Sequence, residues 1–226
     1  MSMNQKWILI DNEKFYYEEV ELFHGRKIMD PKISLENLRI FNNIMEKSQV
    51  LYGLFFGSLL GAIREKNFIE HDEDIDIYLL NEEREKFLRL LVLFKNEGLN
   101  LVRSEGDMLS LMRNNEYIDI YFFKPKLKFG FIKLRVFSNE YEYAAENLEN
   151  PIKYIFLGIN ISIPNNPKTV IEKIYGKNWR TPLKSKHSEP NTIYNSISKM
   201  STKLKTLPFY GKLELNTKNL LKRLGL

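Results

Sequence analysis

The chain has 226 residues, enough for one large domain with an extension or for two small domains. Hydrophobic residues make up 43% of it and charged residues 28%, a balance that excludes disordered and low-complexity proteins. No stretch approaches the roughly 18 uninterrupted apolar residues of a spanning helix, and no apolar signal block follows Met1. Because cysteine is absent, disulfides and thiolate metal sites are excluded, and we expect a cytoplasmic protein whose metals bind oxygen ligands.

The positive charge is concentrated at the C-terminal end. The formal net charge is +5, but residues 184–226 contain nine lysines and arginines against two acids, a local charge of +7. The first 183 residues therefore sum to about −2. We expect a core domain over residues 1–183 and a basic extension over residues 184–226.

Hydrophobic periodicity predicts alternating helices and strands, as expected of an α/β (α+β) core. In chain order the pattern predicts short strands and loops over 7–29, a helix over 34–48, a strand over 50–56, a helix over 59–65, a strand from Asp74, a helix over 81–96, strands over 99–103, 108–113, 117–123 and 129–136, and a helix over 167–175. Ser34 and Asn81 are the expected N-caps of the two long helices.

The strand from Asp74 carries the densest acidic cluster. Asp74 and Asp76 alternate with Ile75 and Ile77, which predicts a half-buried strand with both carboxylates on one face. Acidic clusters are usually solvated turns, but unneutralised carboxylates on such a strand would be costly. Mg²⁺ or Mn²⁺ is the natural counter-ion, and Asp119, in the same apolar–Asp–apolar pattern, is expected to complete the site from a neighbouring strand.

A glycine and a serine precede this cluster. Gly57 and Ser58 follow a buried strand and open a helix, so free backbone N–H groups and a hydroxyl would lie near the carboxylates and suit a phosphate. The pair alone is a weak signal. Its weight comes from the order of elements, in which the turn precedes the Asp-x-Asp strand and the third aspartate follows a helix.

These residues resemble the LicD family of the DNA polymerase β-like nucleotidyltransferase superfamily. The resemblance lies in FGSLLGAIR at 56–64, HDEDIDI at 71–77 and IDI at 118–120, with a supporting match in IYGKNWRTP at 174–182. It implies a nucleotidyltransferase-like mixed β-sheet flanked by helices. Two departures are visible: Glu70-His71 replaces the family's Pro-Trp, and Glu73 replaces one aspartate.

The resemblance implies transfer of an alcohol phosphate, such as phosphocholine, from a CDP-linked donor to a glycan hydroxyl, with release of CMP. Metal ions held by Asp74, Asp76 and Asp119 would neutralise the diphosphate. Asp119 or Asp72 would accept the proton of the acceptor hydroxyl. Arg64 and Lys66 are candidate phosphate contacts, although a solvated role suits Lys66 equally well, and His71 would either orient a carboxylate or lie on the surface.

Two other functions remain open at this point. A nucleotidyltransferase that leaves NMP on a small molecule or a protein would share the same turn and aspartates, and would release pyrophosphate. A nucleic-acid-binding module would explain the basic extension but not the carboxylates. The extension is either a solvated tail or a contact with the anionic inner face of a membrane, where lipid-linked glycan acceptors would lie.

Overall fold

The computed structural model describes residues 5–23, 25–138 and 141–182. Its helices and strands all lie in one compact unit, Met1–Thr181. The predicted basic extension over residues 184–226 lies outside the described residues.

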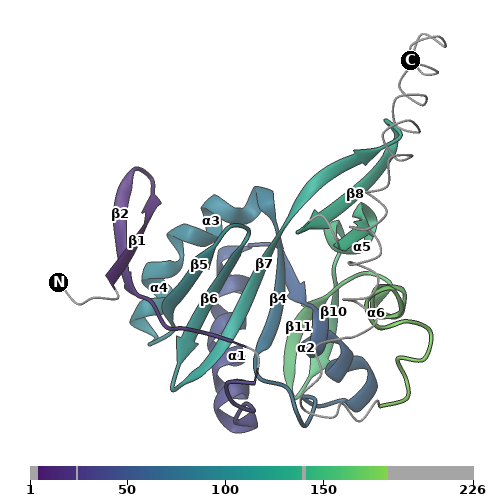
Figure 1. Ribbon diagram of the computed structural model, residues 1–226, viewed down its shortest axis with the longest axis horizontal. Helices are drawn as coiled ribbons and strands as arrows, with labels where there is room; N and C mark the ends of the chain where they lie inside the picture. Colours follow the sequence, from purple (N-terminus) through teal and green to yellow (C-terminus); the bar gives the residue numbers. More distant parts are fainter. Residues whose placement is uncertain (1–4, 24, 139–140, 183–226) are drawn as a thin grey trace, which may run out of the picture. The chain divides into compact units, whose positions relative to one another are not determined.

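A mixed β-sheet forms the centre of this unit (Figure 1). Its main path follows the order β3-β4-β7-β6-β5, in which β4 and β7 run parallel and the other neighbours run antiparallel. The bounds of these strands are β3 (Tyr52–Leu54), β4 (Ile75–Leu80), β5 (Asn100–Glu105), β6 (Met108–Arg113) and β7 (Glu116–Lys128). The far end of β7 pairs with β8 (Ile132–Phe137), which pairs with β9 (Tyr141–Ala144). The expected mixed sheet is therefore present.

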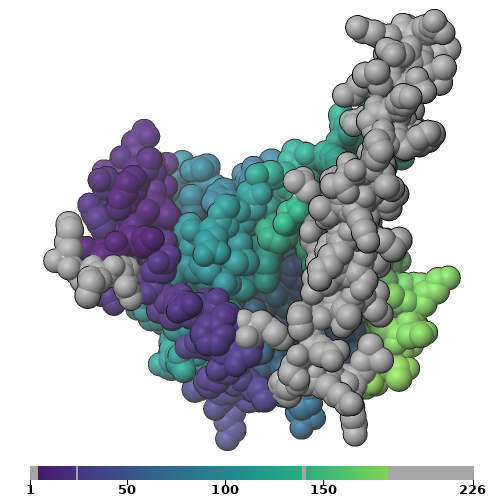
Figure 2. Space-filling model, in the orientation of Figure 1, coloured from purple at the N-terminus to yellow at the C-terminus, as the bar shows by residue number. Residues whose placement is uncertain are grey.

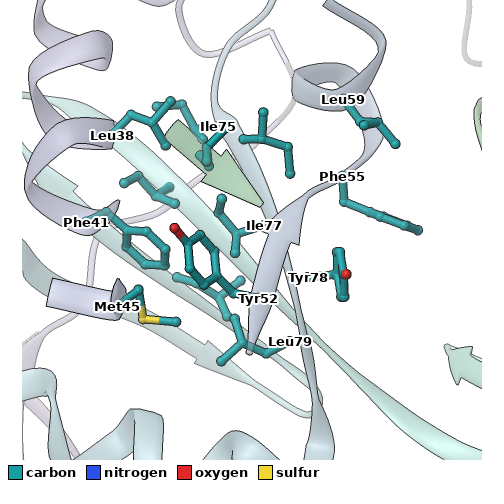
Figure 3. Close-up of a cluster of buried hydrophobic side chains, with 14 of the residues drawn as sticks. Leu38, Phe41, Met45, Tyr52, Phe55, Leu59, Ile75, Ile77, Tyr78 and Leu79 are labelled. Carbon is teal, nitrogen blue, oxygen red and sulfur yellow. The ribbon is translucent and has the colours of Figure 1, made fainter. Parts of the chain in front are cut away.

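Helices pack on both faces of the sheet. Strand residues alternate in direction, so Ile75 and Ile77 face α1 (Pro31–Ser48), whereas Tyr78 faces the opposite side and bonds through its hydroxyl to the Leu148 carbonyl (Figure 3). The α1 side also carries α3 (Arg84–Arg89) and α4 (Leu91–Asn96), through contacts among Phe41, Phe87 and Phe94. On the Tyr78 side lie α2 (Phe56–Leu60), α5 (Ala145–Glu149) and α6 (Pro167–Tyr175).

Two hairpins complete the unit. Strands β1 (Gln5–Ile10) and β2 (Glu13–Glu18) pair with each other as the purple hairpin of Figure 1, whose atoms form the purple lobe at the same side of Figure 2. Strands β10 (Ile152–Phe156) and β11 (Ile159–Ile163) form the second, with β11 next to β3. A π-helical turn (Gly61–Glu65) extends α2, and a 3₁₀ turn (Asn81–Glu83) precedes α3. Within the described ranges, no helix is long and apolar enough to cross a membrane.

Several predicted elements differ from the structure. The strand β4 is buried along its whole length on both faces, not half-buried, because helices cover both sides of the sheet. Helix α1 begins at Pro31, and Asp30 caps it by accepting bonds from the N–H groups of Lys32 and Ile33, so Ser34 lies inside the helix. The helix predicted over 81–96 is broken at Leu90, and β9 and β11 were not predicted.

Candidate active site

Strand register gathers the candidate residues into one row across the sheet. Asp76 on β4 lies opposite Asp119 on β7, as the sequence predicted for adjacent strands. Asp119 in turn lies opposite Ser110 on β6, and Ser110 lies opposite Arg103 on β5. Because paired residues point to the same face, these four side chains share the face that carries Tyr78. Asp76 and Asp119 are only 5% and 4% exposed.

Ser58 is bonded directly to Asp76. The Asp76 N–H donates to Ser58 Oγ at 2.9 Å, and the Ser58 N–H donates to Asp76 Oδ2 at 3.3 Å. The Phe55 N–H donates to the Asp76 carbonyl at 2.9 Å, which fixes the entry to α2 against β4. Phe56, at the start of that helix, has φ +33°, on the left-handed side where a β-carbon is strained. The predicted Gly-Ser turn is thus the first turn of α2, and it orients the central carboxylate.

Gly57 brings a further carboxylate close to the backbone. A β-carbon at this position would lie 2.7 Å from Asp72 Oδ2, so only glycine fits without movement of Asp72. Asp72 Oδ2 is itself buried without a hydrogen-bond partner among the described residues. Burial raises the pKa of Asp72 to about 6. The absent side chain of Gly57 therefore leaves room for the Asp72 carboxylate, whose Oδ2 lacks a hydrogen bond among the described residues.

Asp74 lies in the bend just before β4, and its carboxyl group is within hydrogen-bonding reach of Asp119. Burial first, and then the carboxylates of Asp76, Asp119 and Asp72, raise the pKa of Asp74 strongly. Burial, Asp72 and Asp119 raise the pKa of Asp76 in the same direction. Four acidic side chains are thus crowded in a volume where their combined negative charge is only partly balanced.

Arg103 supplies the positive charge that the structure does show. Its Nη2 lies 2.7 and 2.9 Å from the two carboxylate oxygens of Asp119, and its Nε donates to Ser110 Oγ at 2.9 Å. Ser110 Oγ lies 2.6 Å from Asp119, and the Tyr121 hydroxyl donates to Asp76 Oδ1 at 3.1 Å. These three residues were not predicted, because only strand register brings them to the carboxylates.

A cavity of about 250 Å³ opens at this edge of the row. The residues that line it come from the acidic segment, from β5 and β7 and from the chain before α1: Leu22, Phe23, His71, Asp72, Glu73, Asp74, Arg103, Tyr117 and Asp119. Glu73 accepts the Gly25 N–H at 2.8 Å with each carboxylate oxygen, which ties the N-terminal chain to this site. Glu73, which replaces an aspartate of the family pattern, thus lines the cavity.

The two predicted basic phosphate contacts have other partners. Arg64 donates through Nη1 to the Trp179 carbonyl at 3.0 Å, and Lys66 donates to the Tyr154 hydroxyl at 2.7 Å. Neither residue is among those that line the cavity. The structure thus brings together Gly57, Ser58 and the three aspartates, but not Arg64 and Lys66, whose role with phosphate stays a prediction.

The donor set suits a hard divalent cation in its chemistry. Carboxylate oxygens are the ligands that Mg²⁺ and Mn²⁺ prefer, and the crowded, buried aspartates have the unbalanced negative charge that such an ion offsets. The aspartates do not have the geometry of a metal centre, since no group of three His, Cys, Asp or Glu side chains within the described ranges could hold an ion as placed. Asp119 is engaged by Arg103 and Ser110 instead.

Known proteins share this part of the chain. The family model described as LicD/FKTN/FKRP, nucleotidyltransferase domain, matches residues 49–166. The lipopolysaccharide cholinephosphotransferase LicD of Haemophilus influenzae is 34% identical over 73 residues, which are 32% of this chain and 28% of that protein. The human ribitol-5-phosphate transferase FKTN is 24% identical over 191 residues, covering 74% of this chain and 38% of that protein.

A solved structure is also similar. A putative nucleotidyltransferase of Thermotoga maritima aligns with a TM-score of 0.44 and 14% identity, over 81% of this chain and 97% of that one.

The chain spans less than half the length of the curated relatives named above. The family match covers more than half of this chain and includes β3, α2, β4 and β7, the elements that position the acidic row. The chain therefore belongs to the LicD/FKTN/FKRP nucleotidyltransferase-domain family.

Proposed function

We propose that the protein transfers an alcohol phosphate from a CDP-activated donor to a glycan hydroxyl and releases CMP. The observation that carries the proposal is the register of β4 and β7, which sets Asp76 opposite Asp119 with Asp74 in reach, inside the part of the chain that the family model matches. Named relatives support the class of reaction, because they are cholinephosphate and ribitol-phosphate transferases.

The proposed step forms one P–O bond and breaks one. The oxygen of the acceptor hydroxyl attacks the phosphorus that carries the alcohol, the bond to the CMP oxygen breaks, and CMP leaves with the bonding electron pair. The hydroxyl proton passes to a carboxylate. Asp72 suits this role because its buried Oδ2 has no hydrogen-bond partner among the described residues and its pKa is raised to about 6, near the pH at which a base must work. Asp119 is the alternative base.

Asp74, Asp76 and Asp119 are the residues that would hold Mg²⁺ or Mn²⁺. The ion would supply positive charge to the diphosphate and to the leaving CMP. Ser58 positions Asp76 through its two hydrogen bonds, and Arg103 positions Asp119. For Asp119 we propose a mixed role in which metal ligation is dominant and proton transfer is secondary.

The acceptor is proposed to be a glycan or a lipid-linked glycan at the inner face of the cytoplasmic membrane. The polymerase-like alternative, which leaves NMP on its target, uses the same carboxylates but a different donor. The two reactions differ in product, since alcohol-phosphate transfer releases CMP and nucleotidyl transfer releases pyrophosphate from an NTP.

The test is a panel of CDP-alcohols, including CDP-choline and CDP-ribitol, incubated with the full chain and Mg²⁺. We expect at least one CDP-alcohol to raise the melting temperature in the presence of Mg²⁺, and to release CMP when a glycan acceptor is added. NTPs alone should not yield pyrophosphate. Pyrophosphate release from an NTP, with no response to any CDP-alcohol, would replace the proposed reaction with nucleotidyl transfer.

A further inference from the structure

The paired ends of β7 and β8 carry large apolar side chains into solvent. Phe129 and Phe131 are each 76% exposed, Leu127 is 62% exposed and Ile132 is 39% exposed. Every residue from 124 to 133 is exposed. In Figure 1 this teal hairpin runs past the main sheet to a narrow turn. Two phenylalanines on either side of a turn glycine, both three-quarters exposed, are unusual on a soluble surface and indicate an interaction site.

Lysines surround this tip. The segment from 124 to 133 contains four lysines, Lys124, Lys126, Lys128 and Lys133, and no acidic residue. Lys124, Lys126 and Lys128 are each 44% to 51% exposed. Lys124 pairs with Asp107, and Lys126 and Lys128 pair with Glu142, so two acidic residues of other segments offset part of the four positive charges.

The phenylalanines lie at the end of the hairpin, and the lysines lie behind them on both strands. Strand pairing sets Lys128 opposite Ile132 and Leu127 opposite Lys133, so the first lysine lies one residue from Phe129 on β7 and two residues from Phe131 on β8. The Lys128 amine lies 5.9 Å from the centre of the Phe129 ring, over its face. When the phenylalanines enter the acyl boundary of a bilayer, which lies about 5–10 Å below the surface, the lysine amines reach the lipid phosphates.

We propose that this tip, defined as residues 127–132 with its flanking lysines, docks the protein on an anionic lipid bilayer. Phenylalanine favours the apolar part of a membrane boundary, and the lysines beside it match the negative charge of anionic lipid phosphates. A second copy of the same tip is a poorer partner, since it would bring two sets of lysines together. The proposal concerns a described hairpin and is independent of the predicted tail contact and of the reaction.

The test measures binding of the full chain to sedimented vesicles of phosphatidylcholine, with and without phosphatidylglycerol. We expect binding only to the anionic vesicles and its loss at high salt. The double variant Phe129→Ser/Phe131→Ser should weaken binding at least about tenfold. The variant Lys126→Gln/Lys128→Gln/Lys133→Gln should weaken it at least as much, since each lysine near an anionic surface contributes about fivefold.

The β1–β2 hairpin offers a matched control. Trp7 is 49% exposed and Leu9 is 53% exposed, and Lys14 lies over the Trp7 ring at 4.5 Å, so the second hairpin also pairs exposed apolar groups with a lysine. Trp7→Ser/Leu9→Ser should leave vesicle binding within twofold of the wild type. Circular dichroism melting checks that each variant is folded, and the exposed positions predict little change.

Three outcomes would overturn the proposal. The first is vesicle binding that survives Phe129→Ser/Phe131→Ser unchanged, which would assign binding to another surface such as the predicted tail. The second is an equal loss in Trp7→Ser/Leu9→Ser, which would show nonspecific apolar adsorption. The third is a failure of the wild-type chain to bind anionic vesicles, whether or not light scattering finds a dimer that depends on the tip.

Discussion

Asp76 is the best-fixed residue of the acidic row. Its backbone and carboxylate are bonded to Ser58, its carboxylate accepts from Tyr121, and strand pairing sets it opposite Asp119. Its position is therefore built by two strands, a helix start and a tyrosine. Burial and the neighbouring carboxylates raise its pKa, so the fold holds this group at a cost that a bound cation would remove.

Replacing Asp74 or Asp76 by asparagine should abolish transfer while leaving the fold intact. Each change removes a ligand for the proposed ion, and we expect at least about 100-fold lower turnover. The change also removes a carboxyl group whose ionised form is disfavoured by burial and by its neighbours, so the melting temperature without metal should be equal to or higher than that of the wild type. Asp11→Asn, at an exposed position paired with Arg89, is the control and should keep full activity. Near-normal turnover in either site variant would contradict the proposed metal role.

Arg103 is expected to substitute for part of the cation's charge. Its guanidinium pairs with Asp119, and the side chains are 14% and 6% exposed, so removal leaves a buried carboxylate without a counter-charge. Arg103→Gln should destabilise the metal-free protein by about 3–5 kcal/mol. Added Mg²⁺ should then raise its melting temperature by more than it raises that of the wild type. Arg113→Gln, whose partner Glu36 is 56% exposed, is the control, and equal Mg²⁺ responses in all three proteins would contradict the idea.

The prediction of single residues succeeded where a local pattern carried the information. The Asp-x-Asp and Ile-Asp-Ile alternations identified the three aspartates that the fold brings together. Arg103 and Ser110 have no such local signal. They reach Asp119 because β5, β6 and β7 pair in a particular register, and that register depends on turns and on a shift between Leu101 and Arg103.

At the scale of elements, the start of α2 links the sheet to the site. The helix begins immediately after β3, its first turn carries Gly57 and Ser58, and Ser58 is bonded to β4. The absent side chain of Gly57 gives room to the Asp72 carboxylate. The start of α2 thus lies against two acidic side chains, Asp72 and Asp76. The short strand β3, the strained Phe56 and the glycine at position 57 produce this arrangement.

Gly57→Ala should disturb the site through Asp72 specifically. The new β-carbon would lie 2.7 to 3.2 Å from the carboxylate atoms of Asp72, so we expect a loss of about 1–3 kcal/mol of stability and reduced turnover. Asp72→Ala removes those atoms. In the double variant the stability loss caused by Gly57→Ala should largely disappear, which denaturant unfolding of the four proteins can measure. Strict additivity of the two changes would show that the cost has another origin.

Element prediction failed mainly at ends and in short strands. The apolar period over 81–96 is continuous, yet the helix is broken at Leu90. Phe87 and Phe94, on either side of the break, still pack against each other and against Phe41. The strand β7 extends to Lys128, beyond the predicted end at Phe123, since β8 pairs with residues that lack an apolar period. Pairing with a neighbouring strand, and not the apolar period, decides this boundary.

At the scale of the whole molecule, the clustered carboxyl groups of Asp72, Asp74 and Asp76 make the stability of the fold depend on pH and on metal. Asp72 has a pKa raised to about 6, above its ordinary value of 3.8, and the pKa values of Asp74 and Asp76 are raised further. A raised carboxyl pKa means that the folded protein holds the proton more tightly than the unfolded chain. The stability from this source is complete below pH 3.8 and is lost as pH rises through the folded pKa.

Metal-free protein should therefore become less stable as pH rises from about 4 to 6 and beyond, with Asp72 alone contributing on the order of 2–3 kcal/mol. Asp30 and Glu142, whose pKa values are lowered by hydrogen bonds, contribute in the opposite direction, but their gain is largely complete once pH exceeds their ordinary values of 3.8 and 4.5. Melting curves in a chelator across this range measure the effect, and Asp72→Asn should flatten the dependence on pH.

Mg²⁺ should restore stability at the upper end of the range, where the carboxylates are ionised, and have little effect at the lower end, where protons occupy them. Two results would contradict the view that the crowded carboxyl groups stay protonated until a cation binds. One is a melting temperature that rises with pH in the chelator, and the other is a Mg²⁺ effect that does not depend on pH.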